Sequence, residues 1–217
     1  MKKSVLFSAL FLLVTLSANA TIRTVSNSPS TTIAQFSTIQ AAINASSSGD
    51  TVYVNGSPNN YASFTITNKK LLIIGPGWSP DKNSSFVANV PGCTITGSGS
   101  NNTELQGLVF TSNVNVTSGA NSNFRFIRNK FNNPLHIDQF GEIYSGFLFE
   151  GNTFTNMTVN GGTSSFYMNF VFQNNYFYGT TVSLFGFNRS TNTVLLTIIC
   201  FLDQQAEVRM HSVHAVP

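Results

Sequence analysis

Hydrophobic and polar positions repeat at a constant interval between residues 123 and 179. The segment Phe124–Phe131 has the pattern Phe-x-Phe-x-x-Asn-x-Phe, which returns at Phe147–Phe154 and at Phe170–Phe177. The asparagine moves by 152 − 129 = 23 residues and then by 175 − 152 = 23. A fixed period between about 20 and 50 residues is typical of solenoid proteins, in which each repeat forms one coil. The pattern therefore predicts a solenoid.

The alternation inside each repeat predicts a short strand followed by a bend. Side chains two apart on a strand point to the same face, so Phe124 and Phe126 should face the core while Arg125 faces outward. The asparagine three residues later tolerates the left-handed conformation of a tight bend, and its amide can bond to the asparagine of the next coil. Stacking of parallel coils should align the columns Asn129, Asn152, Asn175 and Phe126, Phe149, Phe172.

Before these repeats, the pattern predicts a short helix and several separate strands. In residues 36–49 the apolar positions share one helical face, and Ser37 with Gln40 has the form of an N-terminal capping box. Gly107–Phe110 resembles the start of the later repeat at Asn123, with an offset of 123 − 107 = 16. Runs rich in β-formers predict strands at Thr51–Val54, Phe64–Thr67, Leu71–Ile74 and Cys93–Thr96.

The N-terminal motifs also resemble those of a known family. Phe-x-x-Ile-Gln-x-Ala-Ile from Phe36 and Gly-Asp-Thr-Val from Gly49 are similar to the cap and first coil of secreted parallel β-helix proteins of the pectate-lyase-like superfamily. The resemblance covers roughly residues 36–179. It implies an all-β, right-handed parallel β-helix of about six coils, capped by the helix at 36–49. Leucine-rich repeats fit less well, because the segments between strands lack a second set of regularly spaced leucines.

The N-terminal segment indicates export. Residues 1–20 contain two lysines, an apolar run and the A-x-A motif Ala18-Asn19-Ala20, which together predict a secretory signal peptide of bacterial type. The mature chain should begin at Thr21 with an extended lead-in to residue 35. We expect the mature protein to be extracellular, on the cell surface or in the periplasm. The apolar run is shorter than the roughly 20 residues of a membrane span, so no transmembrane segment is expected in the mature chain.

The repeat fails near the C-terminal end. A 23-residue step from Asn175 reaches Ile198, where the pattern requires asparagine. One encoding of Thr197–Leu202 reads Asn-Asn-Met-Phe-Leu two bases further on. We therefore expect the repeat domain to span residues 36–196, with a frameshift that truncates a longer array and leaves residues 197–217 out of frame. A divergent but genuine C-terminal segment is the alternative.

Charge and composition exclude several classes of function. Without Lys2 and Lys3, the chain has 9 of its 11 basic side chains against 8 acidic ones, so no basic patch for nucleic acid is expected. Charged residues make up only 9% of the chain, and its two cysteines are too few for a disulfide scaffold. We expect no cofactor and no metal site.

Acidic residues are too sparse to indicate a catalytic site. Glycoside hydrolysis requires two carboxyl groups about 5–9.5 Å apart on either side of the bond. Elimination of the pectate-lyase type requires Ca²⁺ held by several carboxylates. The chain has 8 acidic residues in all, and they are scattered along it. The sequence therefore predicts no catalytic residue.

One group of residues is a candidate for ligand binding. The candidates near the first regular repeat are Arg125, Arg128, His136, Asp138 and Glu142. They would form an acid/base or sugar-binding cluster. The alternative is an ordinary ion pair between Arg128 and Glu150 in neighbouring coils, with the other residues solvated, because exposed pairs of this kind are common. Tyr176, in the outward column after Asn175, is a candidate for stacking on a sugar ring.

These observations predict a binding protein more strongly than an enzyme. We expect an exported β-helix protein that serves as a surface or extracellular binding or structural module, with polysaccharide or a cell-envelope component as its partner. The alternative is a polysaccharide lyase or glycoside hydrolase whose catalytic coils were lost, or were built from Asp138 and Glu142. Polysaccharide enters both expectations through fold analogy alone.

Overall fold

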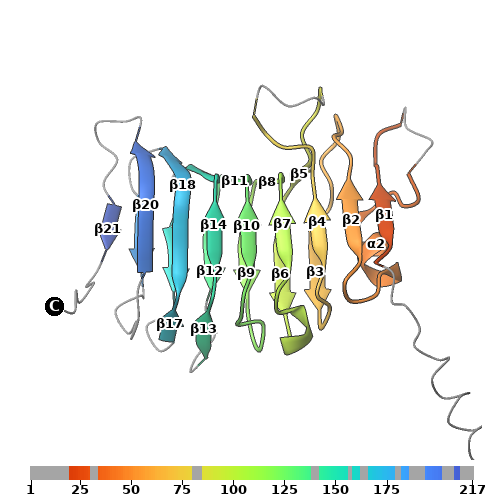
Figure 1. The fold of residues 1–217 in the computed structure, drawn as a ribbon. Coiled ribbons are helices and arrows are strands. Elements are labelled where there is room, and N and C mark those ends of the chain that lie inside the picture. The colour runs from red at the N-terminus through yellow and green to blue at the C-terminus, as the bar shows by residue number, and fades with distance from the viewer. Residues whose placement is uncertain are drawn as a thin grey trace, which may run out of the picture.

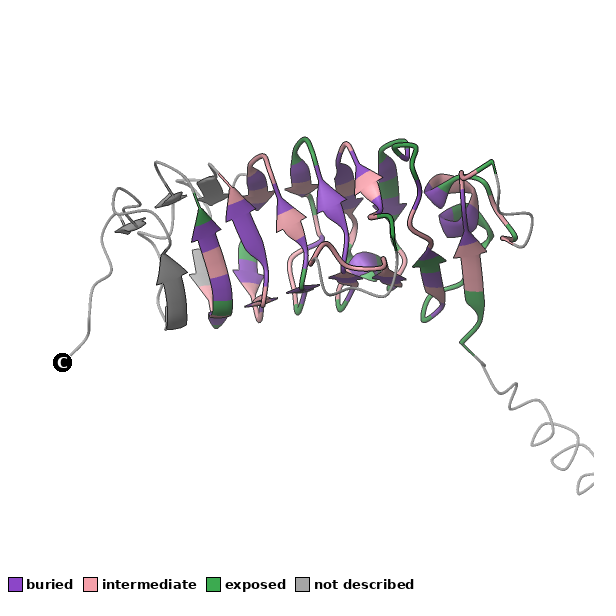
Figure 2. Cartoon of the chain, turned by 90° about the horizontal axis from the view of Figure 1, so that it is seen from above, coloured by how far each residue is buried: buried purple, intermediate pink, exposed green. Residues whose placement is uncertain are grey.

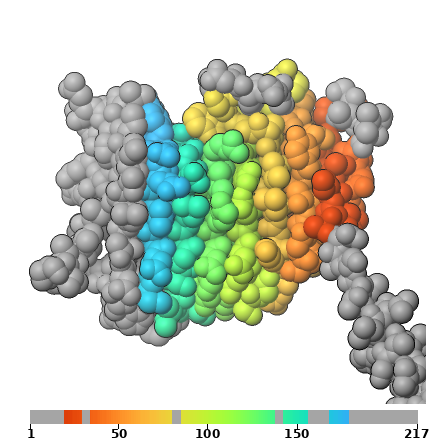
Figure 3. Space-filling model, viewed as in Figure 1, coloured from red at the N-terminus to blue at the C-terminus, as the bar shows by residue number. Residues whose placement is uncertain are grey.

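The chain forms a parallel β-solenoid of about five turns, with one short α-helix in the part of the chain described (Figure 1). The computed structural model describes residues 20–29, 34–79, 85–137, 142–155, 158–161, 166–178, 182–185, 194–201 and 208–210. Successive coils lie side by side along one axis and appear as neighbouring bands on the surface (Figure 3). None of the helical segments described is long and apolar enough to cross a membrane.

Three rows of parallel strands run along the solenoid axis. The first row contains β1 (Ile22–Val25), β2 (Thr51–Val54), β4 (Leu72–Ile74), β7 (Glu104–Gln106), β10 (Arg125–Ile127), β14 (Leu148–Glu150) and the first half of β18 (Phe170–Tyr178), with β20 (Val194–Phe201) paired to β18. The second row contains β5 (Asn89–Val90), β8 (Val109–Phe110), β11 (Lys130–Phe131), β15 (Thr153–Thr155) and the second half of β18. Because β18 spans both rows, they count as one 12-stranded sheet.

The third row is a separate sheet of 7 strands. It contains β3 (Phe64–Thr67), β6 (Cys93–Thr96), β9 (Val114–Val116), β12 (Leu135–Ile137), β16 (Thr158–Gly161), β19 (Val182–Phe185) and β21 (Val208–Met210). Near one corner, β13 (Ile143–Ser145) pairs with β17 (Phe166–Met168), and a 3-10 turn, η1 (Ser98–Ser100), follows β6. The predicted strands at Thr51–Val54, Phe64–Thr67 and Cys93–Thr96 are confirmed with these bounds.

Columns of stacked phenyl rings fill the core of the later coils. Phe149 lies between Phe126 and Phe172, with ring centroids 5.2 Å and 4.4 Å away. A second column contains Phe110, Phe131, Phe154 and Phe177 at 5.3, 5.1 and 5.0 Å. A third contains Phe124, Phe147 and Phe170 at 5.2 and 4.6 Å. Much of the strand surface is buried, while exposed residues are frequent in the connecting turns (Figure 2). The predicted phenylalanine columns are confirmed.

The predicted asparagine column forms a buried ladder of hydrogen bonds. Asn152 donates from Nδ2 to the Phe126 carbonyl at 2.7 Å, and its Oδ1 accepts from the backbone N–H of Asn129 at 2.9 Å. Asn175 repeats both contacts one coil later, with Phe149 at 2.8 Å and the Asn152 N–H at 2.9 Å. All three asparagines are 0–2% exposed, so these bonds satisfy amide and backbone groups that water does not reach.

The prediction that these asparagines adopt the left-handed conformation is wrong. The residue before each one does so instead: Arg128 has φ 51°, Gly151 62° and Asn174 54°. The bend therefore precedes the ladder, and the asparagine is free to point inward. Its capacity to satisfy backbone groups, and not its tolerance of positive φ, explains its place in the repeat.

The phenylalanine stack of the second row begins one coil earlier than the sequence pattern indicates. Gly107–Phe110 was expected to match the segment starting at Asn123, yet Phe110 is in register with Phe131 and Leu105 with Phe126. The offset is 131 − 110 = 21, and Leu108 precedes Val109 where later coils have asparagine. The early coils vary in length: Val52 pairs with Ile73 at an offset of 73 − 52 = 21, and Ile73 with Leu105 at 105 − 73 = 32. The chain makes about five turns, where the sequence predicted about six.

Helix α2 (Ile39–Ala45) covers the N-terminal end of the stack. Its buried face contains Ile39, Ala42 and Ile43, as predicted, but the helix is shorter than the predicted range of 36–49, and Phe36, also predicted on that face, precedes it. The predicted capping box is wrong, because the N-cap is Thr38, whose hydroxyl accepts from the Ala41 N–H at 3.2 Å.

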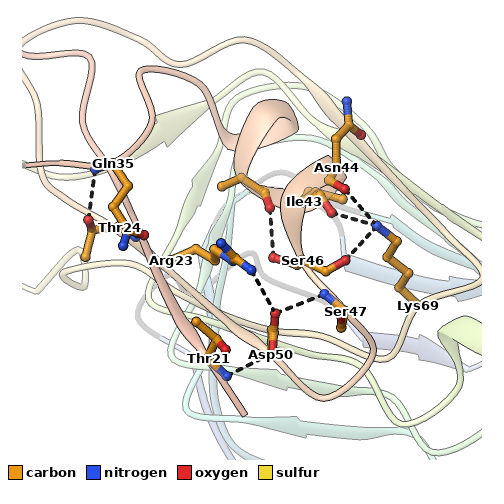
Figure 4. Close-up of polar contacts among 11 residues, drawn as sticks. Thr21, Arg23, Thr24, Gln35, Ile43, Asn44, Ser46, Ser47, Asp50 and Lys69 are labelled. Atoms are coloured by element: carbon orange, nitrogen blue, oxygen red, sulfur yellow. Dashed lines mark hydrogen bonds and ion pairs between the residues drawn. The ribbon is translucent and has the colours of Figure 1, made fainter. Parts of the chain in front are cut away.

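Side chains tie the helix to the coils next to it. Gln40 accepts the backbone N–H of Thr65 at 2.7 Å and donates to its carbonyl at 3.2 Å, as a neighbouring strand would. Lys69 donates to the carbonyls of Ile43, Asn44 and Ser46 at the helix end (Figure 4). A cation satisfies carbonyl groups that a helix leaves unpaired at its C-terminus.

The last described coil continues the first row with a longer step. β20 pairs Leu196 with Phe172 and Ile199 with Asn175, an offset of 196 − 172 = 24. The 23-residue step therefore misses this strand by one residue. The frameshift stays a prediction, and most of residues 197–217 lies outside the described residues.

Candidate functional site

The structure does not gather the predicted ligand-binding residues into one site. Arg125 lies on β10 and Arg128 in the bend after it, both beside the first row, whereas His136 is the middle residue of β12 in the third row. Tyr176 lies in the second row, in register with Thr153. Asp138 lies outside the described residues. The predicted residues that are described therefore belong to separate faces of the solenoid.

Arg125 forms an ion pair, but not within the predicted cluster. Its Nε lies 3.4 Å from Glu104 Oε2 of the preceding coil, and Glu104 also accepts a hydrogen bond from Gln106. The ion pair expected between Arg128 and Glu150 does not occur between these described side chains; their contact is the Arg128 N–H donating to the Glu150 carbonyl at 2.9 Å. The sequence thus predicted an ion pair between neighbouring coils, but between the wrong two residues.

Substituting Arg125 with alanine should have little effect on stability. The arginine side chain is 51% exposed, and exposed ion pairs contribute about 0.2–1 kcal/mol. Urea unfolding of Arg125→Ala should therefore give a free energy of unfolding within about 1 kcal/mol of wild type. A larger loss would show that the pair organises the first row.

Glu142 has a structural role in the corner after β12. Its Oε1 accepts from the Gly119 N–H at 3.3 Å, and its Oε2 accepts from Asn121 Nδ2 at 3.0 Å. Both oxygens thus hold the corner of the preceding coil, which leaves the carboxylate poorly placed to act on a substrate. Within the described ranges, no group of three or more His, Cys, Asp and Glu residues could hold a metal ion.

A polar groove that the sequence did not reveal crosses the third row. It is open, has a volume of about 260 Å³, and passes over the starts of β3, β6 and β9. Its lining consists of Ser63, Phe64, Thr65, Gly92, Cys93, Thr94, Ser112, Asn113 and Asn115. The strand register aligns Thr65, Thr94 and Asn115 in one column across three coils, and His136 follows Asn115 in the same column.

One coil passes close to the next at Gly92, which lines the groove. A Cβ at that position would lie 2.1 Å from the Asn113 carbonyl oxygen, so only glycine fits. The walls carry hydroxyl and amide groups, which donate and accept hydrogen bonds without carrying charge. Cys93 is buried in the wall, and burial raises the pKa of its thiol. A protonated, buried thiol is a poor nucleophile, so Cys93 is not suited to nucleophilic attack on a ligand in the groove.

Comparisons with known proteins add nothing to this description. No protein-family model, no curated protein and no solved structure matches the chain. A signal for the groove was nevertheless present in the sequence. Phe-Thr-Ile-Thr at Phe64 and Cys-Thr-Ile-Thr at Cys93 place a polar residue between two buried ones, and Val-Asn-Val at Val114 repeats this pattern.

Proposed function

We propose that this protein is an exported, non-catalytic binding module of the right-handed, pectate-lyase-like β-helix type, which binds a neutral polysaccharide along its third row of strands. The observation that carries the proposal is the groove over β3, β6 and β9, lined by uncharged hydroxyl and amide groups. Sugar hydroxyls both donate and accept hydrogen bonds, and threonine, serine and asparagine side chains can answer both needs.

The repeat of the groove along the axis favours a polymer over a small ligand. The Thr65, Thr94 and Asn115 column presents one polar side chain per coil, and neighbouring strands in a sheet are about 4.8 Å apart. A linear chain that lies along the axis would meet similar groups at each coil. The volume of about 260 Å³ is below the range of about 300–1,000 Å³ in which pockets enclose small molecules.

Thr94→Arg should block this groove. Thr94 lies in the middle of the column, so a long charged side chain there would fill the space and bring an unpaired charge against a neutral ligand. Native gel electrophoresis through a panel of neutral and acidic polysaccharides would measure binding. We expect retardation of the wild type by at least one neutral polysaccharide, and a dissociation constant about tenfold or more higher for the variant, which is a loss of about 1.4 kcal/mol.

Thr67→Arg is the matched control, because Thr67 is another threonine between or beside buried residues on a strand of the third row but does not line the groove. It should bind like the wild type. Equal retardation of Thr94→Arg and wild type would reject the groove as the binding surface. The same polysaccharides, assayed for reducing ends and for unsaturated products, test the enzyme alternative: turnover that Asp138→Asn abolishes would replace the binding proposal by a catalytic one.

A further inference from the structure

The first residue of the predicted mature chain is held by a buried carboxylate. The backbone nitrogen of Thr21 donates to Asp50 Oδ1 at 2.8 Å, and the Ser47 N–H donates to Oδ2 of the same group at 2.9 Å. Arg23 Nη2 lies 3.8 Å from Oδ2. Figure 4 shows Thr21, Arg23 and Ser47 converging on Asp50. Asp50 is only 4% exposed, whereas Ala20 and Thr21 are both exposed residues.

We propose that Asp50 is a binding site for the α-ammonium group of Thr21, which is created when the leader is cleaved after Ala20. Cleavage hydrolyses the Ala20–Thr21 amide with one water molecule, and the nitrogen that already contacts Asp50 becomes a protonated amine. An amide nitrogen donates one hydrogen bond and carries no charge. The ammonium has three donors and a positive charge, and hydrogen bonds between two charged groups are roughly twice as strong as neutral ones.

The inference rests on the predicted export of the chain and is independent of what the groove binds. The ammonium would contact a carboxylate that is already stabilised by N–H groups and by nearby cationic side chains. The N–H groups of Thr21 and Ser47 lower the pKa of Asp50 more than burial raises it, and Arg23 and Lys69 lower it further. The carboxylate is therefore ionised at neutral pH.

The site would link cleavage of the leader to the pairing of β1 with β2 at the N-terminal end of the solenoid. The Thr21 carbonyl accepts from the Thr51 N–H at 2.9 Å, which begins the pairing of β1 with β2. The other edge of β1 is covered by Gln35 and Phe36: Gln35 Oε1 accepts the Thr24 N–H at 3.2 Å, and Phe36 donates to the Thr24 carbonyl at 3.0 Å. Holding Thr21 would thus fix the strand that shields β2, whose exposed edge could otherwise pair with another chain.

Stabilisation by this contact should weaken at high pH, where the α-amine loses its proton. A neighbouring carboxylate favours the charged amine, so the α-amine should titrate above its free-chain pKa of about 7.7–8.0. Stabilisation is then fully present below that value and is lost as the pH rises through the higher folded-state pKa. The charged groups around the site are Asp50, Arg23 of β1, and Lys69 of the segment before β4.

Two chains that differ by one residue test the proposal. One begins at Thr21 and the other at Ala20, so the second has its free amine one residue away from Asp50. At pH 7 the chain beginning at Thr21 should melt about 2–4 °C higher, the shift expected when one charge-assisted contact is gained in a domain of this size. The difference should vanish near pH 10. Titrating lysines and tyrosines are common to both chains and cancel in the comparison.

Asp50→Asn in both chains is the control, and the two variants should melt at the same temperature. Equal melting of the unsubstituted chains at pH 7 would overturn the proposal, as would a difference that persists at pH 10 or in the Asp50→Asn pair. N-terminal sequencing of the full-length gene product, after export from a bacterial host, should find threonine first. Any other first residue would refute cleavage after Ala20. Polysaccharide binding by the same chains is measured separately, so failure of one proposal is distinguishable from failure of the other.

Discussion

Replacing Phe149 with alanine is expected to lower the free energy of unfolding by about 3–5 kcal/mol. Phe149 is fully buried between two stacked rings and also contacts Phe154 of its own coil at 6.5 Å between centroids. Coils above and below are hydrogen-bonded to its strand, so they cannot close the space that the ring leaves. Urea unfolding followed by circular dichroism would measure the loss.

Leu148→Ala provides the comparison for this substitution. Leu148 precedes Phe149 on β14 and is only half-buried, on the outer face of the first row. Its removal should cost clearly less than that of Phe149. Similar losses for the two variants would show that stacked phenyl rings are not the main source of stability in these coils.

Asn152→Asp should be nearly as destabilising as the loss of the ring, although it changes only one atom of the side chain. The new oxygen would replace Nδ2, which donates to the Phe126 carbonyl at 2.7 Å and to Asn175 Oδ1 at 3.1 Å. An ionised carboxylate would then face two acceptors without water. Leaving a buried charge uncompensated costs about 3–5 kcal/mol, which urea unfolding at pH 7 would detect.

The destabilisation caused by Asn152→Asp should decrease at acidic pH. A loss of packing would not depend on pH in this way, so the pH dependence identifies an electrostatic cause. A buried carboxyl facing acceptors titrates above the unfolded value of about 3.9, so the deficit relative to wild type is largest above the folded-state pKa. It should shrink as the pH falls toward 3.9, because a protonated carboxyl can donate to the Phe126 carbonyl. Asn113→Ala, at an exposed asparagine, is the control and should unfold like the wild type. A pH-independent deficit for Asn152→Asp would contradict this account.

The parts of the fold that depend on strict repetition were predictable from the sequence. In the first two rows each coil adds 23 residues between β10 and β18, so the phenylalanine and asparagine columns appear directly as a sequence period. The early strands were also predictable, because they are short runs rich in β-forming residues and are separated by glycine, asparagine and proline. Hydrogen bonding along the asparagine column was also predictable, because an asparagine amide can bond to the coils on both sides of it.

The third row was less predictable, because its turns vary in length. Leu135 is in register with Val114 at an offset of 135 − 114 = 21, but with Val159 at 159 − 135 = 24. A fixed period cannot align such strands, and the column of Thr65, Thr94 and Asn115 was therefore missed. The proposed groove depends on that alignment. The clustering of Arg125 with His136 failed for a related reason: residues near in sequence lie on different faces once the chain bends between rows.

The asparagine ladder also sets the size of the unit that can unfold on its own. Asn152 bonds to Phe126 and Asn129 of one neighbouring coil and to Asn175 of the other, so no single coil can detach without breaking buried bonds in two others. The strand register places Ile199 opposite Asn175 at one end, and Leu108 occupies the corresponding position at the other. We expect opening from either end of the solenoid to meet this ladder at the coil of Leu108, which Asn129 holds, or at the coil of Asn175, and the coils between them to open together.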